Sequence, residues 1–173
     1  MRLIEMLLRE HSKAQRDRII TYIGRNPKRF ADLIQVFQDG PYRVTQRAAW
    51  PLSYCAALHP KLVQPHLGKL LTFAKKPGVH DAVKRNVVRL LQFIAIPKKH
   101  HAKTIDLCFG FLKNPKEPVA VRVFAMTVLA NLAKQHPSLA NEIIPMIETQ
   151  LPYATAAFRN RGAKMLKELS KSW

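Results

Sequence analysis

Four arginines recur along the chain at nearly constant spacing, and their chemistry is the first clue to what the chain does. Spacings of 38, 37 and 39 residues separate Arg47, Arg85, Arg122 and Arg161. A guanidinium group can bind a phosphate or carboxylate through two parallel hydrogen bonds, and it can equally bridge to acids and carbonyls of a neighbouring segment. Because these four arginines follow a repeat, we favour the second, structural interpretation for them.

Basic residues that fall outside this period are the better candidates for contacts with a ligand. They lie on the same predicted helices as the periodic arginines, and closely spaced cations suit a phosphate backbone. The candidates for binding a polyanion are Arg43, Lys84, Arg89, Arg159 and Lys164. The alternative is that these side chains only form a solvated face.

Three aromatic residues stand near Arg43 and Arg47 in the sequence, namely Tyr42, Trp50 and Tyr54. Aromatic rings beside arginines can stack on bases or pack against a peptide. Large aromatic residues at helical spacing are, however, mostly buried. Core packing is therefore the favoured interpretation of Trp50, and a stacking platform is the alternative.

Motifs for catalysis and metal binding are missing. The seven histidines and two cysteines form no His-Glu-x-x-His and no Cys-x-x-Cys pattern, and there is no glycine-rich phosphate loop or Gly-x-Ser-x-Gly elbow. The adjacent His100 and His101 cannot face one site from a helix. We therefore predict no catalytic residues, no metal and no cofactor.

The composition describes a basic globular protein. Lys and Arg number 29 against 11 Asp and Glu, which gives a net charge of +18, and 47% of the residues are hydrophobic. So much apolar sequence excludes a disordered tail. A charge of this size favours a polyanionic partner, either nucleic acid or an acidic protein. A generally basic proteome, or solubility alone, is the alternative explanation.

The sequence also predicts a compartment. Cys55 and Cys108 lie within apolar helical patterns, which indicates buried thiols in a reducing environment. No apolar run approaches the ~18 residues that a membrane span needs. The apolar start of the chain is interrupted by Glu5, so we interpret it as an amphipathic helix of a cytoplasmic protein. Its apolar face makes weak dimerisation an alternative to a monomer.

A second marker shows how these residues are positioned. Prolines recur in the pairs Asn26-Pro27, His59-Pro60, Ile96-Pro97 and His136-Pro137, again with a period near 37. Such a period is typical of solenoids, and apolar residues at spacings of three and four predict two helices in each repeat. We expect a single domain, residues 1–173, of five antiparallel helix pairs. The pairs are expected at residues 1–25, 27–58, 60–95, 97–134 and 137–171. The helices of the second pair are expected near 27–38 and 42–58, and those of the third near 60–75 and 79–95.

The segment from Asn114 to Leu129, NPKEPVAVRVFAMTVL, resembles the turn and second helix of a HEAT repeat. Residues 40–52 and 78–91 follow the same outline, and 155–166 do so more weakly. The resemblance implies an all-α, armadillo-like right-handed solenoid with the second helices, and hence the arginines, on its concave face. The family's aspartate before the arginine is not regularly present, and no acid lies between Leu151 and Arg161.

These observations predict a non-catalytic scaffold whose basic concave surface binds nucleic acid ahead of an acidic protein. The alternative is an adaptor between proteins, whose affinity would survive moderate salt. A third possibility comes from HEAT-like alkylpurine DNA glycosylases, which the chain resembles in fold class and charge. Such an enzyme needs a carboxylate and aromatics, and Asp81 with Trp50 and Tyr54 is the nearest set.

Overall fold

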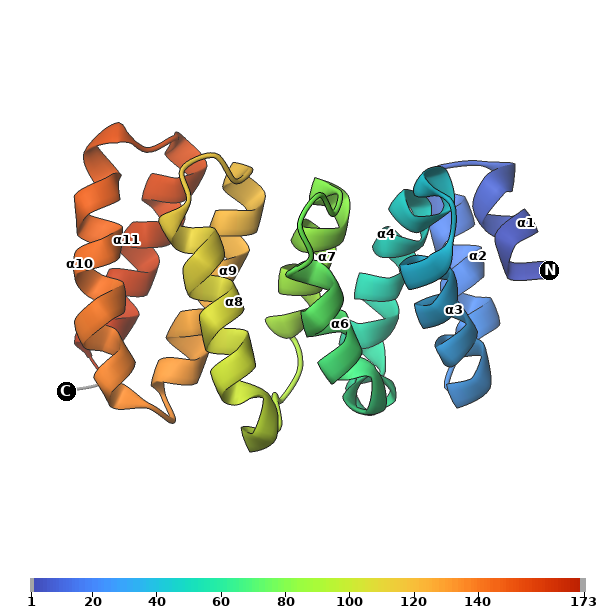
Figure 1. The fold of residues 1–173 in the computed structure, drawn as a ribbon, viewed down its shortest axis with the longest axis horizontal. Helices are drawn as coiled ribbons and strands as arrows, with labels where there is room; N and C mark the ends of the chain where they lie inside the picture. The colour runs from blue at the N-terminus through green and yellow to red at the C-terminus, as the bar shows by residue number, and fades with distance from the viewer. Residues whose placement is uncertain (1, 172–173) are drawn as a thin grey trace. The chain divides into compact units, whose positions relative to one another are not determined.

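A computed structural model of the protein describes residues 2–171, and every regular element in them is a helix (Figure 1). Residues 1, 172 and 173, which we had included in the expected domain of residues 1–173, lie outside the described residues. The chain forms two compact units, Met1–Pro97 (unit 1) and Lys98–Trp173 (unit 2). The boundary falls between the third and fourth of the expected helix pairs.

Unit 1 holds the first three pairs. Its helices are α1 (Arg2–Arg9), α2 (Lys13–Ile23), α3 (Pro27–Asp39), α4 (Tyr42–Leu58), α5 (Pro60–Val63), the 3-10 turn η1 (Gln64–His66), α6 (Leu67–Ala74) and α7 (Asp81–Leu91). In the ribbon, α3 and α6 form one layer, and α2, α4 and α7 form the layer behind it (Figure 1). Helix α4 packs against both α2 and α7, so residues from three successive pairs come together on that layer.

Side chains at the helix starts explain where several of these helices begin. The hydroxyl of Ser12 accepts a hydrogen bond from the Gln15 amide at 3.0 Å, and Asn26 Oδ1 accepts one from the Arg29 amide at 3.1 Å. Each satisfies a backbone donor that the helix itself leaves unpaired. Helix α2 ends at Gly24, whose φ of 51° lies in the left-handed region that glycine adopts without strain.

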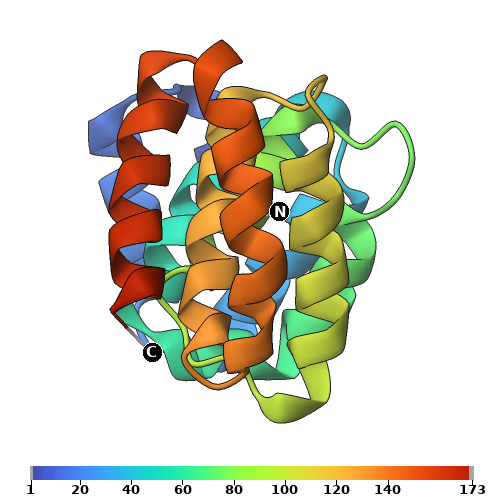
Figure 2. The same ribbon diagram turned by 90° about the vertical axis from the view of Figure 1, so that its left-hand side faces the viewer.

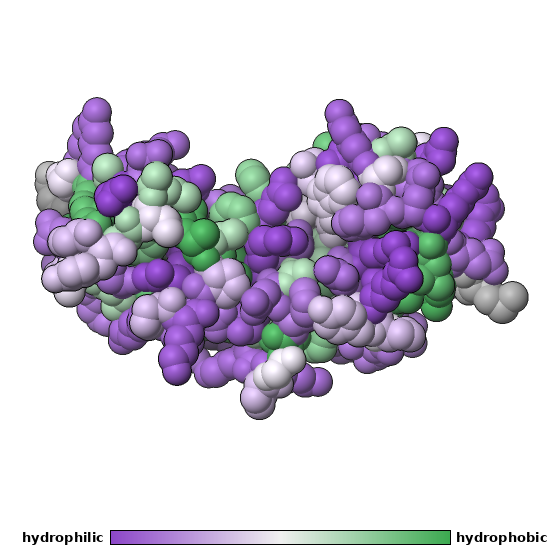
Figure 3. Space-filling view, turned by 90° about the horizontal axis from the view of Figure 1, so that it is seen from above, coloured by the Kyte–Doolittle hydropathy of each residue, from purple (hydrophilic) through white to green (hydrophobic). Residues whose placement is uncertain are grey.

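The core of unit 1 lies between its two helix layers. Phe30, Phe37, Leu52, Leu67 and Leu90 are fully buried there, and each such side chain stabilises the fold by ~1.5–3 kcal/mol. The outer surface of both units is mostly hydrophilic on the face seen in Figure 3, with small apolar patches among the polar side chains.

Unit 2 holds the last two pairs. It contains η2 (Lys98–His100), α8 (His101–Lys113), α9 (Val119–Ala133), η3 (Pro137–Leu139), α10 (Ala140–Gln150), η4 (Leu151–Tyr153) and α11 (Ala156–Ser170). The four α-helices lie alongside one another in Figure 2, and α9 packs against the other three. Phe158 of α11 and Leu129 of α9 are fully buried in this core.

Most boundaries agree with the sequence, and the differences have local causes. The first helix of the third pair, expected over 60–75, is broken by η1 because Pro65 has no amide hydrogen for a regular helix. The second helix of that pair, expected over 79–95, ends at Leu91. Both cysteines are buried as expected, and burial raises the pKa of the Cys55 thiol to about 12.

Candidate functional site

A recess of about 300 Å³ opens on the layer of unit 1 that contains α4 and α7. Helix α4 contributes two residues one turn apart and α7 contributes three, while His11 comes from the turn between α1 and α2. The lining residues are His11, Gln46, Trp50, Arg85, Asn86 and Arg89. None of them is acidic.

Two aromatic rings of α4 join the cations around this recess. The Arg16 guanidinium of α2 lies 4.8 Å from the centre of the Trp50 ring and 4.1 Å from that of Tyr54. Arg89 approaches the Tyr54 ring at 4.7 Å, and His11 lies against Trp50 with ring centres 5.4 Å apart. Cation–π contacts of this kind hold the guanidinium groups in fixed positions without cancelling their charge.

The positive charge at the recess is only partly neutralised. Arg16 is nearly buried and donates hydrogen bonds from Nε and a terminal nitrogen to Asp17 Oδ1, at 2.8 and 2.6 Å. Within residues 2–171, neither Arg85 nor Arg89 pairs with a carboxylate. The pKa of the Tyr54 hydroxyl is lowered, chiefly because Arg89 hydrogen-bonds to it and because Arg89 and Arg16 are positively charged.

Asn86 gives the recess an uncharged hydrogen-bond acceptor. This side chain is only 3% exposed, and its Nδ2 donates to the carbonyl oxygen of Ala82 at 2.8 Å. A carbonyl oxygen can only accept, so the nitrogen end of the amide must face Ala82. The other end, Oδ1, has no donor among the described residues. The buried amide therefore presents a free acceptor at the wall of the recess.

The four periodic arginines do not share one environment. Arg47 donates to the carbonyl oxygens of Leu7 and Leu8 at 3.0 and 2.9 Å. Arg161 donates to the Thr127 hydroxyl at 2.6 Å, and Arg122 donates to Gln150 Oε1. Each of these three joins its helix to a different one. Arg85 is exposed and lines the recess instead.

Arg122 also packs against an aromatic ring of α11. Its guanidinium stands 4.7 Å from the centre of the Phe158 ring, and its pKa is lowered because burial removes solvent from the charge. Its Nε has no hydrogen-bond partner among the described residues. These contacts hold α9, α10 and α11 of unit 2 together.

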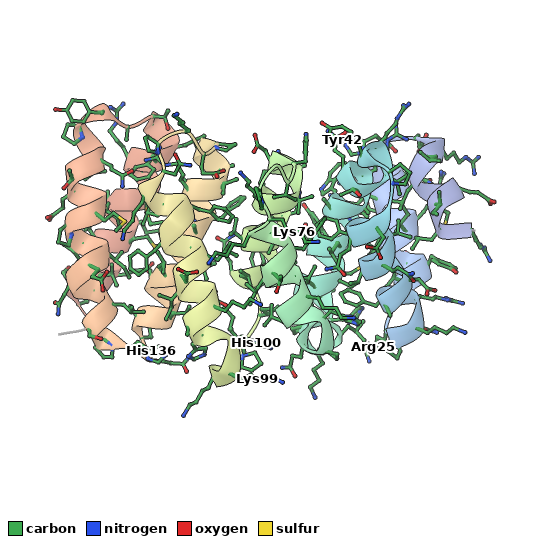
Figure 4. The ribbon with its side chains drawn as sticks, viewed as in Figure 1. Arg25, Tyr42, Lys76, Lys99, His100 and His136 are labelled. Carbon is green, nitrogen blue, oxygen red and sulfur yellow. The ribbon has the colours of Figure 1, made fainter. Side chains whose placement is uncertain are left out.

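The other expected site residues lie elsewhere. Tyr42 is 64% exposed at the start of α4, at one end of unit 1, and packs edge-on against His80 with ring centres 4.7 Å apart (Figure 4). Arg43 is exposed beside it. Lys84 pairs with Asp81 at 3.8 Å, and neither residue lines the recess. Arg159 and Lys164 are exposed on α11 of unit 2.

The structure therefore brings together Trp50, Tyr54 and Arg89, and adds residues that the sequence analysis did not name as ligand contacts. These are His11, Arg16, Gln46, Arg85 and Asn86. A usable signal was present, because Gln46, Trp50 and Tyr54 follow a spacing of four, as do Arg85 and Arg89. Residues four apart share one face of a helix.

Two further properties bear on function. Nowhere in residues 2–171 do three or more His, Cys, Asp or Glu side chains form a group that could hold a metal ion. Over the same residues, every helix is too short or too polar to cross a membrane.

Comparison with known proteins places the fold. A solved structure of a designed armadillo repeat protein, YIII(Dq.V1)4CPAF in complex with peptide (KR)4, superposes with a TM-score of 0.61. The two sequences are 16% identical, and the match covers 96% of this chain and 80% of the designed one. No curated protein matches the chain significantly. The all-α solenoid class expected from the sequence is thereby confirmed.

A family model agrees with this fold. The model describes a HEAT repeat domain, and it matches residues 3–169, which include every periodic arginine. Because this match spans nearly the whole sequence, the chain belongs to the HEAT repeat family.

Proposed function

We propose that the protein is a non-catalytic scaffold that binds a polyanion, with nucleic acid as the preferred ligand and the recess of unit 1 as the point of contact. One observation carries the proposal. Arg85, Arg89 and Trp50 line the recess without an acidic residue. Beside it, Arg16 packs against Trp50 and Tyr54, and Arg89 packs against Tyr54. A solenoid supplies a long surface for such a ligand, and repeat scaffolds act by binding partners.

The charge of the chain supports a polyanion over a neutral partner. A net charge of +18 attracts phosphates at long range, and binding then releases the counterions that surround them. Arg85 and Arg89 are suited to the final contacts because a guanidinium can bind phosphate through two hydrogen bonds. Such contacts fix position along a backbone without reading its sequence.

The designed armadillo neighbour offers an instructive contrast. Its structure contains a peptide named (KR)4, which is a run of basic residues. A basic peptide would be repelled by a chain of charge +18, so the charge of the present scaffold favours an anionic ligand. An acidic protein segment is accordingly the second candidate, because the neighbouring structure holds a peptide and not a nucleic acid.

The test is fluorescence anisotropy with labelled single-stranded and duplex oligonucleotides over a series of salt concentrations. The variant Arg85→Glu/Arg89→Glu removes the two recess arginines that lack acidic partners. We expect its affinity to fall at least about tenfold and the log–log salt slope to become shallower by about 2.

The matched control is Arg25→Glu/Lys28→Glu, which changes the net charge equally at exposed positions of unit 1 outside the recess. Arg25 lies at the lower edge of unit 1 in Figure 4, whereas Tyr42 lies at the upper edge. We expect the control to weaken binding less than the recess variant does. Equal losses would show diffuse attraction, and absence of binding at low salt would reject nucleic acid. Stronger competition by polyglutamate than by an unlabelled oligonucleotide would favour the acidic protein.

A further inference from the structure

Phosphate binding alone does not account for the chemistry of the recess. A phosphate needs donors, yet the recess also contains the uncharged acceptor of Asn86 and the ring of Trp50. We propose that the recess accepts one unpaired nucleobase of a single-stranded nucleic acid, with the neighbouring phosphates on Arg85 and Arg89. This inference rests on the proposed function and makes it specific.

Asn86 selects for an unpaired base. Its Oδ1 has no donor in the described part of the chain, and the amide is held by the bond to Ala82, so it cannot turn its nitrogen toward the recess without losing that bond. Every nucleobase carries an N–H donor on its Watson–Crick edge. In a duplex that edge is paired with the opposite strand, and only the amino groups of adenine, cytosine and guanine keep a free hydrogen in the grooves. An acceptor at the wall of the recess therefore favours an unpaired base, whose whole edge can enter.

Trp50 supplies a surface on which such a base can stack. The indole is half-buried, lines the recess, and is held between α4 and the turn that carries His11. The Arg16 guanidinium at 4.8 Å fixes the ring further. Base–aromatic stacking tolerates any base and typically contributes about 5- to 150-fold in affinity, as judged from alanine substitution.

The volume and charge of the recess agree with this ligand. About 300 Å³ is at the small end of the range for small-molecule sites, which suits a single base and not a larger group. Arg85 is exposed at the recess, while Arg89 is half-buried and fixed against Tyr54 at 4.7 Å. The two arginines lie one helical turn apart on α7, so both can reach phosphates next to the inserted base.

The experiment uses the full chain and three probes: a single strand of ~12 nucleotides, an abasic strand with the same number of phosphates, and the duplex of the first strand with its complement. Anisotropy reports affinity. Quenching of tryptophan fluorescence reports stacking, and Trp173→Phe leaves Trp50 as the only tryptophan. We expect the base-bearing strand to bind at least about tenfold more tightly than the abasic strand and to be the only probe that quenches Trp50.

The outcomes separate the two proposals. If all three probes bind equally and Trp50 is not quenched, the nucleobase site is rejected while the polyanion scaffold stands. If no probe binds at low salt, both are rejected. Quenching by the base-bearing strand, with weaker binding of the abasic one, supports both.

Variants give a second, independent readout. Asn86→Ala removes the acceptor. We expect it to lower the affinity for the base-bearing strand several-fold and to leave the affinity for the abasic strand unchanged. Circular dichroism and thermal unfolding check that the variant folds. An equal loss of affinity for both strands would overturn the role of Asn86. The quenching of Trp50 is measured with Asn86 in place, so that test does not depend on this variant. Gln92→Ala, at the C-cap of α7 and outside the recess, is the control for the loss of an amide.

Discussion

The guanidinium of Arg47 lies 3.0 Å from the carbonyl oxygen of Leu7, forty residues earlier in the chain. A second hydrogen bond at 2.9 Å reaches the carbonyl of Leu8. Both carbonyls belong to the last turn of α1, where backbone acceptors have no partner within the helix. A positive charge at a helix C-terminus also interacts favourably with the helix dipole. One side chain of α4 therefore completes the end of α1.

Replacing Arg47 should destabilise unit 1. We expect Arg47→Ala to lower the free energy of unfolding by about 1.5–3 kcal/mol, since hydrogen bonds from a charged donor are lost and two carbonyls are left without it. Urea unfolding followed by circular dichroism measures the change. Arg43→Ala, at an exposed position of the same helix, should stay within about 0.5 kcal/mol. Similar values for both variants would contradict the structural role.

The hydroxyl of Tyr54 should titrate below the ordinary tyrosine value of 10.0, because Arg89 and Arg16 favour the phenolate. Arg89→Ala removes the largest cause, so we expect the pKa of Tyr54 to rise. Absorbance at alkaline pH, with Tyr54→Phe to identify the signal, measures the change.

The sign of the linked stability follows from that pKa. The folded protein binds fewer protons at Tyr54 than the unfolded chain between the lowered pKa and 10.0. The contribution of Tyr54 to stability therefore rises with pH through this window and is absent below it. A pH dependence identical in the native chain and Tyr54→Phe would contradict the arrangement of charges.

His66 should make unit 1 less stable in acid. Its pKa is lowered, first because it is partly desolvated and second because Lys69 repels the imidazolium. The unfolded chain therefore binds more protons below the ordinary histidine value of 6.5, and stability is lost as pH falls through that value. We expect His66→Gln to flatten this dependence in urea unfolding between about pH 7.5 and 5. An unchanged slope would rule out His66 as its source.

Gly162 should resist substitution, whereas Gly110 should not. A Cβ atom on Gly162 would stand 3.0 Å from side-chain carbons of Ile147 and Leu151, so that α11 could not approach α10 as it does. We expect Gly162→Val to cost about 1–3 kcal/mol through overpacking. Nothing lies within 4 Å of the same position on Gly110, and Gly110→Val should be nearly neutral in thermal unfolding. The reverse order would show that the packing is not tight.

The repeat architecture could be predicted from the sequence because the same residue types recur at corresponding positions of successive helix pairs. Periodic arginines and prolines marked each of the last four pairs, and α3 and α4 begin at Pro27 and Tyr42, as the expected ranges predict. The break at Gln64–His66 was missed because proline is tolerated in a helix's first turn and disruptive further in, and Pro65 follows Pro60 too closely for periodicity to distinguish these cases. The single-domain organisation stays a prediction.

The recess was harder to predict because two spacings must be combined to find it. Its residues lie about one repeat apart on neighbouring helices and four residues apart along each helix. Trp50 follows Arg16 by 34 residues and precedes Arg85 by 35, so neighbours on adjacent helices are one repeat apart in sequence. The spacing of Arg85 matches that of three arginines that hold helices together, so spacing alone does not separate it from them. Only the surroundings distinguish it: Arg47, Arg122 and Arg161 meet an acceptor on another helix, whereas Arg85 faces the recess.

The recess draws its wall from three stretches that are far apart in the sequence: the turn at His11, helix α4 and helix α7. Without a ligand, the pairs of a repeat protein can open one after another, each with its own exchange rate for amide hydrogens. An occupant that touches all three stretches couples those openings, because none can occur while it stays bound. A bound ligand would therefore slow the exchange of amide hydrogens in α4 and in α7 together. The three neighbouring repeats would then open as one cooperative unit.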